Sequence, residues 1–185
     1  MTKDTHLTIS PRTLTSEQDT EAFALEIAKQ IQKLFHVKNN DLNKALHFSL
    51  MGDLGVGKTT LTRHLLRSLG HAGKVKSPTY GLCEPYQLNI NVKNNANAIA
   101  KTILPFHHFD LYRRSYAKEW MDAGFRDVFS EPGICMVEWP EKAEGTLPRA
   151  DWIISLSTND DETRSLMITS QTDIGDELIK GFQET

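Results

Sequence analysis

The chain has 185 residues, of which 39% are hydrophobic and 24% are charged, values normal for one globular domain with a buried core. Its formal net charge of −3 argues against a free-standing nucleic-acid binder, which usually carries a basic face or a high isoelectric point. No apolar run approaches the ~20 residues of a membrane helix, and the first residues lack the apolar stretch of a secretory signal, so we expect a cytoplasmic protein without a membrane segment.

The N-terminal part of the chain is predicted to contain one helix. Residues 1–14 show no regular pattern, and we expect them to form a flexible N-terminus. Over residues 17–37, apolar side chains recur at the spacing of an amphipathic helix. Thr15 or Ser16 precedes this pattern and is a candidate cap for the helix.

A glycine-rich stretch follows a short apolar run. Residues 45–53 read ALHFSLMGD, a pattern typical of a buried strand, and residues 52–59 read GDLGVGKT. The second run fits G-x-x-x-x-G-K-[ST] without mismatch. Leucines at helical spacing then predict a helix that begins near Lys58 and ends at Gly70. A strand, a glycine-rich loop and a helix in this order are the context that a phosphate-binding loop requires.

The second half of the chain alternates between apolar and polar segments. Residues 77–88 are predicted to form a loop that leads into an extended segment, and residues 87–104 are interpreted as a surface insertion because they are rich in Asn and weakly periodic. A helix is predicted over residues 115–124. Strand patterns cover three further segments, residues 103–113, 133–140 and 151–170, the last as a hairpin followed by a short helix or tail.

This alternation of strands and helices predicts a single α/β domain over residues 1–185. The phosphate-binding loop places it among the P-loop nucleoside triphosphatases. We expect a three-layer architecture with a mainly parallel central sheet, and antiparallel additions at the C-terminal hairpin.

The glycine-rich loop predicts how a triphosphate would be held. Its glycines let the backbone curl so that N–H groups point at phosphate oxygens, and the following helix adds its N-terminal partial charge. Lys58 would reach the β- and γ-phosphates, and Thr59 would hold Mg²⁺ through its hydroxyl. The predicted nucleotide-binding residues of the loop are Leu54, Gly55, Val56, Gly57, Lys58, Thr59 and Thr60.

Two carboxylates are candidates for a second Mg²⁺ anchor. Asp110 ends PFHHFD and Glu138 ends ICMVE, and ligands gather at the carboxyl ends of strands in open α/β sheets. Either carboxylate could serve the metal while the other positions water, and either could be a strand cap without chemistry. His107 and His108 are interpreted as structural residues. Trp139 leaves its strand at the ligand-facing end, so we expect it beside the site.

Ser77-Pro78-Thr79 follows the helix of the phosphate-binding loop. Related enzymes place a mobile loop here, whose Thr or Ser senses the γ-phosphate. An ordinary Ser/Thr-Pro turn explains the same residues equally well. Arg113 and Arg114 are interpreted either as phosphate contacts or as solvated charges.

The rest of the sequence favours ATP over GTP. Guanine-specific proteins usually carry N/T-K-x-D and D-x-x-G, whereas Asn43-Lys44 lacks the required Asp and no Asp in the chain has Gly three residues later. A small-molecule kinase is the main alternative, although no Arg cluster beyond Arg113-Arg114 suggests its lid. A nucleotide-dependent binding module that hardly hydrolyses ATP is a third possibility. A compact ATPase that acts with other proteins fits best.

Several motifs, taken in order, resemble the TsaE (also called YjeE) family. They are GDLGVGKTTLTRHLLRSLG, VKSPTYGLCEPY, HHFDLYR, GFRD and VEWPEKAEGTLP, and together they span most of residues 15–152. This family is the small ATPase of the bacterial pathway that forms threonylcarbamoyladenosine at position 37 of tRNA. The resemblance implies ATP and Mg²⁺ as ligands.

The resemblance also implies roles for individual residues. Lys58 and Thr59 would bind the triphosphate and Mg²⁺, and Glu138 would be the second carboxylate at the metal. Asp110 and Trp139 would be needed for hydrolysis or for its coupling to other events.

Three further roles are implied outside the phosphate-binding loop. Thr79 would lie in the switch-like loop. Glu17 and, on a looser alignment, Arg164 would contact the base side of the nucleotide. The family acts on the complex of TsaD and TsaB, and on tRNA only indirectly. The insertion over residues 87–104 departs from the family pattern, and it could alter partner binding if it lies at the partner surface.

Overall fold

The computed structural model describes residues 6–38, 42–78, 81–93, 99–112, 124–143 and 145–182. The strands are β1 (Thr8–Leu14), β2 (Leu46–Met51), β3 (Cys83–Lys93), β4 (Ile99–Asp110), β5 (Ile134–Glu138), β6 (Trp152–Thr158) and β7 (Arg164–Ser170). The helices are α1 (Glu17–Val37), α2 (Lys58–Ser68) and α4 (Asp173–Lys180), with two short 3-10 helices, η1 (Asp127–Ser130) and η2 (Pro140–Ala143).

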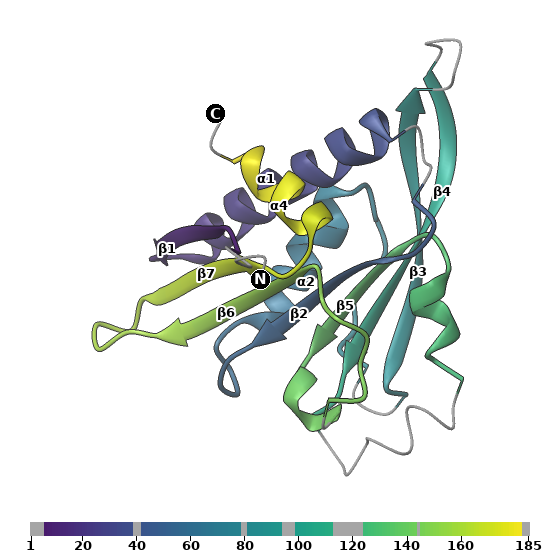
Figure 1. The fold of residues 1–185 in the computed structure, drawn as a ribbon. Helices are drawn as coiled ribbons and strands as arrows, with labels where there is room; N and C mark the ends of the chain where they lie inside the picture. The colour runs from purple at the N-terminus through teal and green to yellow at the C-terminus, as the bar shows by residue number, and fades with distance from the viewer. Residues whose placement is uncertain are drawn as a thin grey trace, which may run out of the picture.

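Within the described residues, the seven strands form one sheet in the order β1-β7-β6-β2-β5-β4-β3 (Figure 1). The four central strands are parallel, since β2 pairs with both β5 and β6, and β4 pairs with β5. Both edges are antiparallel, through the pairs β6–β7, β1–β7 and β3–β4. The predicted P-loop α/β fold with a parallel centre is confirmed, and antiparallel strands extend it at both edges.

Helix α1 begins where the sequence predicts. Ser16 is the N-cap, because its hydroxyl accepts a hydrogen bond from the backbone N–H of Asp19 at 3.2 Å. The carboxylate of Asp19 in turn accepts one from the N–H of Ser16 at 3.0 Å, which completes a capping box. The predicted apolar stripe is buried, at Phe23, Ile27, Ile31 and Leu34.

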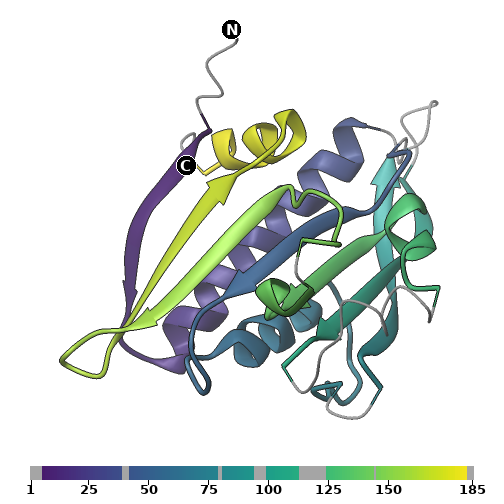
Figure 2. The same cartoon turned by 60° about the horizontal axis from the view of Figure 1, so that its bottom comes forward.

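The core divides between the two faces of the sheet. Side chains of β2 alternate, so that Leu46, Phe48 and Leu50 pack in the larger cluster with α1, α2 and α4. Figure 2 shows α1 and α2 running behind the central strands. The opposite face holds a smaller cluster that includes Phe129 of η1 and Ala143 of η2. Among the described residues, no helix combines the length and the apolar character needed to cross a bilayer.

The expectation of a flexible N-terminus over residues 1–14 is wrong for residues 8–14. This segment forms β1 and pairs antiparallel with β7, with a register shift between Ile9 and Arg12. Only Leu14 of the strand is buried, so the apolar alternation that would have revealed it is missing. Backbone pairing with β7 holds the strand in place, and the periodicity of the sequence carries no information about this pairing. Residues 1–5 lie outside the described residues.

The surface loop expected over residues 87–104 is instead part of the β3–β4 hairpin. Leu88, Ile90 and Leu104 are buried in the main core, while Asn and Gln occupy the alternate positions of β3. The apolar residues of β3 therefore recur at every second position, as in a strand, but the high Asn content led to the interpretation of a loop. Pro85 lies in β3, the edge strand, where a missing N–H is tolerated. The helix predicted over residues 115–124 lies outside the described residues apart from Gly124.

Gly52, at the end of β2, is expected to be required for stability. Its φ is +136°, and a Cβ at this position would collide with the carbonyl oxygen of Leu156. Gly55 also has a positive φ, of +79°, but a Cβ there would meet nothing within 4 Å. We expect Gly52→Ala to lower the free energy of unfolding by about 1–3 kcal/mol more than Gly55→Ala does. Urea denaturation measures both values, and equal losses would contradict this explanation.

The buried His47 predicts a loss of stability in mild acid. The side chain is 3% exposed, and its ring lies 4.9 Å from that of Phe129. Burial lowers the pKa of His47 from 6.5 to about 4. Between these two values the unfolded chain binds a proton that the folded chain does not, so stability is full above pH 6.5 and falls as the pH decreases toward 4.

The fall attributable to His47 should total about 3 kcal/mol by pH 4. Urea unfolding of the wild type and of His47→Gln, at neutral pH and in mild acid, measures it. The variant should show the smaller pH dependence, because the glutamine amide does not titrate. Identical pH dependence in the two proteins would show that His47 is not responsible.

Candidate functional site

The glycine-rich loop joins the end of β2 to the start of α2, at the carboxyl edge of the parallel strands. Gly57 is the N-cap of α2, with a φ of +112° and no side-chain capping bond. The N–H groups of the first helical turn are therefore not occupied by a capping side chain. This is the arrangement in which helix N-termini and loop amides bind phosphate.

Lys58 lies folded across the loop. Its Nζ donates hydrogen bonds to the carbonyl oxygens of Gly52 at 2.6 Å and Asp53 at 2.8 Å. The ammonium also lies 3.8 Å from the ring centroid of Trp139, a cation–π contact. Burial lowers the pKa of Lys58, although the negative charge of Glu138 opposes the shift. These contacts hold the Lys58 ammonium against the glycine-rich loop and the Trp139 ring.

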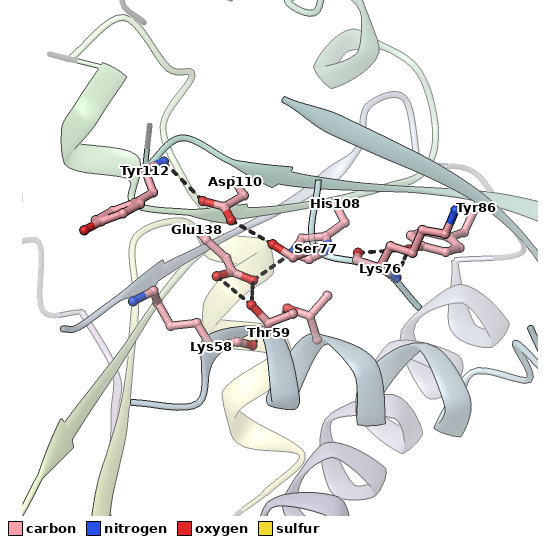
Figure 3. A network of polar contacts seen from close by, with 10 residues as sticks. Lys58, Thr59, Lys76, Ser77, Tyr86, His108, Asp110, Tyr112 and Glu138 are labelled. Carbon is pink, nitrogen blue, oxygen red and sulfur yellow. Dashed lines mark hydrogen bonds and ion pairs between the residues drawn. The ribbon is translucent and has the colours of Figure 1, made fainter. Parts of the chain in front are cut away.

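Thr59 contacts the carboxylate that ends β5. Its hydroxyl lies 2.9 Å from Oε1 and 3.1 Å from Oε2 of Glu138, and Glu138 is only 3% exposed (Figure 3). His108 reaches the same Oε1 through its Nε2 at 2.8 Å. A hydroxyl and a carboxylate are the oxygen donors that Mg²⁺ prefers. The two residues expected at the metal are therefore adjacent, and their donor chemistry fits this ion.

The described residues contain no group of three or more His, Cys, Asp or Glu side chains that could hold a metal by themselves.

Asp110 ends β4 beside Glu138, and the two residues are register partners in the sheet. The contacts of the Asp110 carboxylate differ from those of Glu138. Oδ2 accepts a hydrogen bond from the Ser77 hydroxyl at 2.9 Å, and Oδ1 accepts one from the N–H of Tyr112 at 3.1 Å (Figure 3). Asp110 thus ties the loop that precedes β3 to the end of β4, whereas Glu138 faces the phosphate-binding loop.

The loop that carries Ser77 is also anchored one residue earlier. The Tyr86 hydroxyl accepts a hydrogen bond from the N–H of Lys76 at 3.2 Å and donates to its carbonyl oxygen at 3.3 Å. Thr79, expected in the switch-like part of this loop, lies outside the described residues, as do Arg113 and Arg114.

Trp139 follows Glu138 in a left-handed backbone conformation, with a φ of 59°. Such a φ is strained for a bulky residue, and strained residues cluster at functional sites. Its ring contacts that of Tyr112, with a centroid separation of 4.8 Å, and covers the Lys58 ammonium. The expectation that Trp139 lies beside the site agrees with this position.

These side chains line one hollow of the surface, and a second hollow adjoins it. The first is lined by Leu54, Gly55, Gly57, Lys58, Thr59, Thr60, Ser77, Asp110, Tyr112, Glu138 and Trp139. The second is lined by Ser16, Glu17, Thr20, Gly55, Val56, Gly57, Thr60, Leu156 and Arg164. Because the two share three residues, they form a continuous surface around the phosphate-binding loop.

The second hollow holds the two residues that the resemblance places on the base side of a nucleotide. Arg164 donates from Nε to the carbonyl oxygen of Val56 at 2.9 Å, which holds β7 against the loop. Glu17 lies at the start of α1, with its carboxylate 3.0 Å from Nε2 of His64. Every predicted site residue that the structure describes therefore lies around the two hollows.

Sequence reasoning assigned His108 a structural role, yet the side chain contacts Glu138 directly. The available signal was the period of two along a strand, which turns His108 to the same side as Asp110. Tyr112 and Ser77 also line the site. Tyr112 belongs to the HHFDLYR motif, but nothing in that motif predicts its ring contact with Trp139.

Comparison with known proteins agrees with the geometry. The family model described as threonylcarbamoyl adenosine biosynthesis protein TsaE matches residues 14–166. The tRNA threonylcarbamoyladenosine biosynthesis protein TsaE of Haemophilus influenzae is 43% identical over 139 residues, which cover 75% of this chain and 79% of that protein. The protein of the same name from Bacillus subtilis is 32% identical over 122 residues, which cover 66% of this chain and 68% of that protein.

A solved structure has the same fold. The crystal structure of YdiB from Bacillus subtilis superimposes with a TM-score of 0.70, at 22% sequence identity, and 98% of each chain is covered. The family match extends over the phosphate-binding loop and over the strands that end in Asp110 and Glu138. The chain therefore belongs to the TsaE family.

Proposed function

We propose that this protein is a Mg²⁺-dependent ATPase required for forming N6-threonylcarbamoyladenosine at position 37 of tRNA. The observation that carries the proposal is the contact between Thr59 of the phosphate-binding loop and Glu138 at the end of β5. It joins a loop suited to phosphates with a carboxylate suited to Mg²⁺. Curated relatives named for tRNA threonylcarbamoyladenosine biosynthesis support the biological role.

The chemistry follows from the positions of the side chains. When ATP binds, Lys58 would exchange its contacts to the loop carbonyls for contacts to the β- and γ-phosphates. Thr59 and Glu138 would hold Mg²⁺, which neutralises charge that develops on the phosphoryl oxygens. Asp110 lies next to Glu138 and would orient the attacking water. Water would then attack the γ-phosphorus while the bond to the β–γ bridging oxygen breaks, so that ADP, inorganic phosphate and the proton lost by the water are released.

We further propose that the protein acts on a complex of TsaD and TsaB, and reaches tRNA only through that complex. A net charge of −3 agrees with an indirect role, since direct binding to tRNA usually requires a basic surface. ATP is preferred to GTP because the guanine-recognition motifs are missing from the sequence. The same proposal places the protein in the cytoplasm.

Two measurements test this function. The purified protein should release inorganic phosphate from ATP, faster when TsaD and TsaB are present, and should phosphorylate no added metabolite. Phosphate transfer to a metabolite would favour the alternative, a small-molecule kinase. In cells depleted of the protein, nucleoside analysis of tRNA should show loss of threonylcarbamoyladenosine. Unchanged levels would overturn the biological role and leave the ATPase assignment open to the first measurement.

A further inference from the structure

His108 is completely buried, and within the described part of the chain its side chain makes one polar contact. Its Nε2 lies 2.8 Å from Oε1 of Glu138, and the two side chains are 0% and 3% exposed. Among the described residues, Nδ1 of the same ring has no hydrogen-bond partner. The ring therefore occupies an apolar position without satisfying both of its nitrogens. Two other histidines, His47 and His71, share this feature, but His108 is the one whose second nitrogen contacts a carboxylate at the site.

The strand geometry directs this ring toward the site. His108 lies two residues before Asp110 in β4, so both side chains leave the same face of the strand. Asp110 is the register partner of Glu138 on β5, which places His108 one step below the pair of carboxylates. Phe106, a further two residues back, belongs to the main core. His108 is thus the last layer between that core and the carboxylates.

The carboxylate of Glu138 is held from two directions. Thr59 contacts both of its oxygens from the phosphate-binding loop, and His108 contacts Oε1 from within the sheet. As a ligand of Mg²⁺ the Glu138 carboxylate would only accept hydrogen bonds, and Nε2 of His108 would then be the donor in this contact. If the Thr59 hydroxyl turns toward Mg²⁺, the contact from His108 would still restrict rotation of the carboxylate.

We propose that His108 is a positioning residue that orients the Glu138 carboxylate for Mg²⁺ binding. This inference rests on the proposed Mg²⁺-dependent function and deepens it. Groups that hydrogen-bond a metal ligand from behind fix its orientation, and their loss typically weakens metal binding about 10- to 100-fold. In this role His108 would act through Glu138 and would not itself contact the nucleotide or the metal.

Two substitutions separate positioning from space filling. His108→Phe keeps a ring of similar size but removes the N–H donor. His108→Gln restores a donor, because the glutamine amide nitrogen can occupy a place close to that of Nε2. The neighbouring His107 supplies the matched control, since it points to the opposite face of β4 and packs near Phe109, with 6.5 Å between ring centroids. His107→Phe and His107→Gln change the same residue type in the same strand.

The experiment measures equilibrium binding rather than turnover. Mn²⁺ replaces Mg²⁺ as a spectroscopic probe, and its affinity for the full-length protein with a non-hydrolysable ATP analogue is measured by electron paramagnetic resonance. Calorimetry with EDTA present measures binding of the analogue without metal, and thermal unfolding checks each fold. We expect His108→Phe to weaken Mn²⁺ binding about 10- to 100-fold, with His108→Gln largely restored. Metal-free binding and both His107 variants should match the wild type.

The possible outcomes distinguish this inference from the proposed function. Wild-type Mn²⁺ affinity in His108→Phe would overturn the positioning role and leave the ATPase proposal intact. Equal weakening in His108→Phe and His108→Gln, accompanied by loss of metal-free binding, would show a structural role and would also overturn it. A wild-type protein that binds neither Mn²⁺ nor the analogue would overturn the proposed function itself.

Discussion

Replacing Lys58 with Met is expected to lower the turnover of ATP about 10²- to 10³-fold, the loss typical when one preorganised donor to transition-state charge is removed. Methionine keeps an unbranched apolar stem that can pack against Trp139, but it cannot neutralise the β- and γ-phosphates. ATP affinity should fall as well, because in the proposed site this charge would contact the phosphates already in the ground state. Phosphate release under saturating Mg²⁺ and calorimetric ATP titration measure the two effects.

Lys142 provides the control for this substitution. It is an exposed lysine in η2, three residues after Trp139. Lys142→Met changes the net charge by the same amount but should leave both turnover and affinity unchanged. If Lys58→Met hydrolysed ATP at the wild-type rate, the glycine-rich loop would not be holding the phosphates in the manner proposed.

Glu138→Gln should lower Mg²⁺-dependent turnover by about 10²- to 10³-fold. The amide oxygen of Gln can still accept a hydrogen bond from Thr59, so the local packing is retained while the negative charge is lost. Binding of ATP in EDTA should equal that of the wild type, because the contact that is lost is to the metal. Turnover at graded Mg²⁺ concentrations, together with metal-free binding, distinguishes this loss from unfolding of the site.

Comparison with Asp110→Asn shows which of the two carboxylates binds Mg²⁺. Asp110 contacts Ser77 and Tyr112 rather than Thr59, so its variant should lower turnover without changing the Mg²⁺ concentration at half-maximal rate. Wild-type hydrolysis in Glu138→Gln, together with lost Mg²⁺ dependence in Asp110→Asn, would contradict this assignment. The metal ligand would then be Asp110 and not Glu138.

The parts of the fold that sequence predicts well are those specified by short segments. The glycine-rich loop is contiguous, so its spacing alone locates Lys58 and Thr59 at the start of α2. Helix α1 is equally local, because its cap at Ser16 and its apolar stripe lie within one segment. Such features depend on backbone conformation and helical period, which neighbouring residues determine.

The features that sequence reasoning missed depend on pairing between distant segments. Only Leu14 of β1 is buried, so the strand has no apolar pattern of its own. It forms because it pairs with β7, which is distant in the sequence. The positions of Asp110 and Glu138 at strand ends were predictable, but their separate contacts were not. Those contacts follow from the register between β4 and β5 and from the loop that brings Ser77 near.

The pairing of the β3–β4 hairpin separates its tip from the edge of the sheet that carries Asp110 and Glu138. Its two strands pair residue by residue as far as Lys93 and Ile99, while the last five residues of β4 are fixed independently by pairing with β5. Side chains in strands alternate with a period of two, so removing equal even numbers of residues from both strands preserves the face of every side chain that remains. A hairpin shortened at its tip in this way should therefore keep Asp110 beside Glu138.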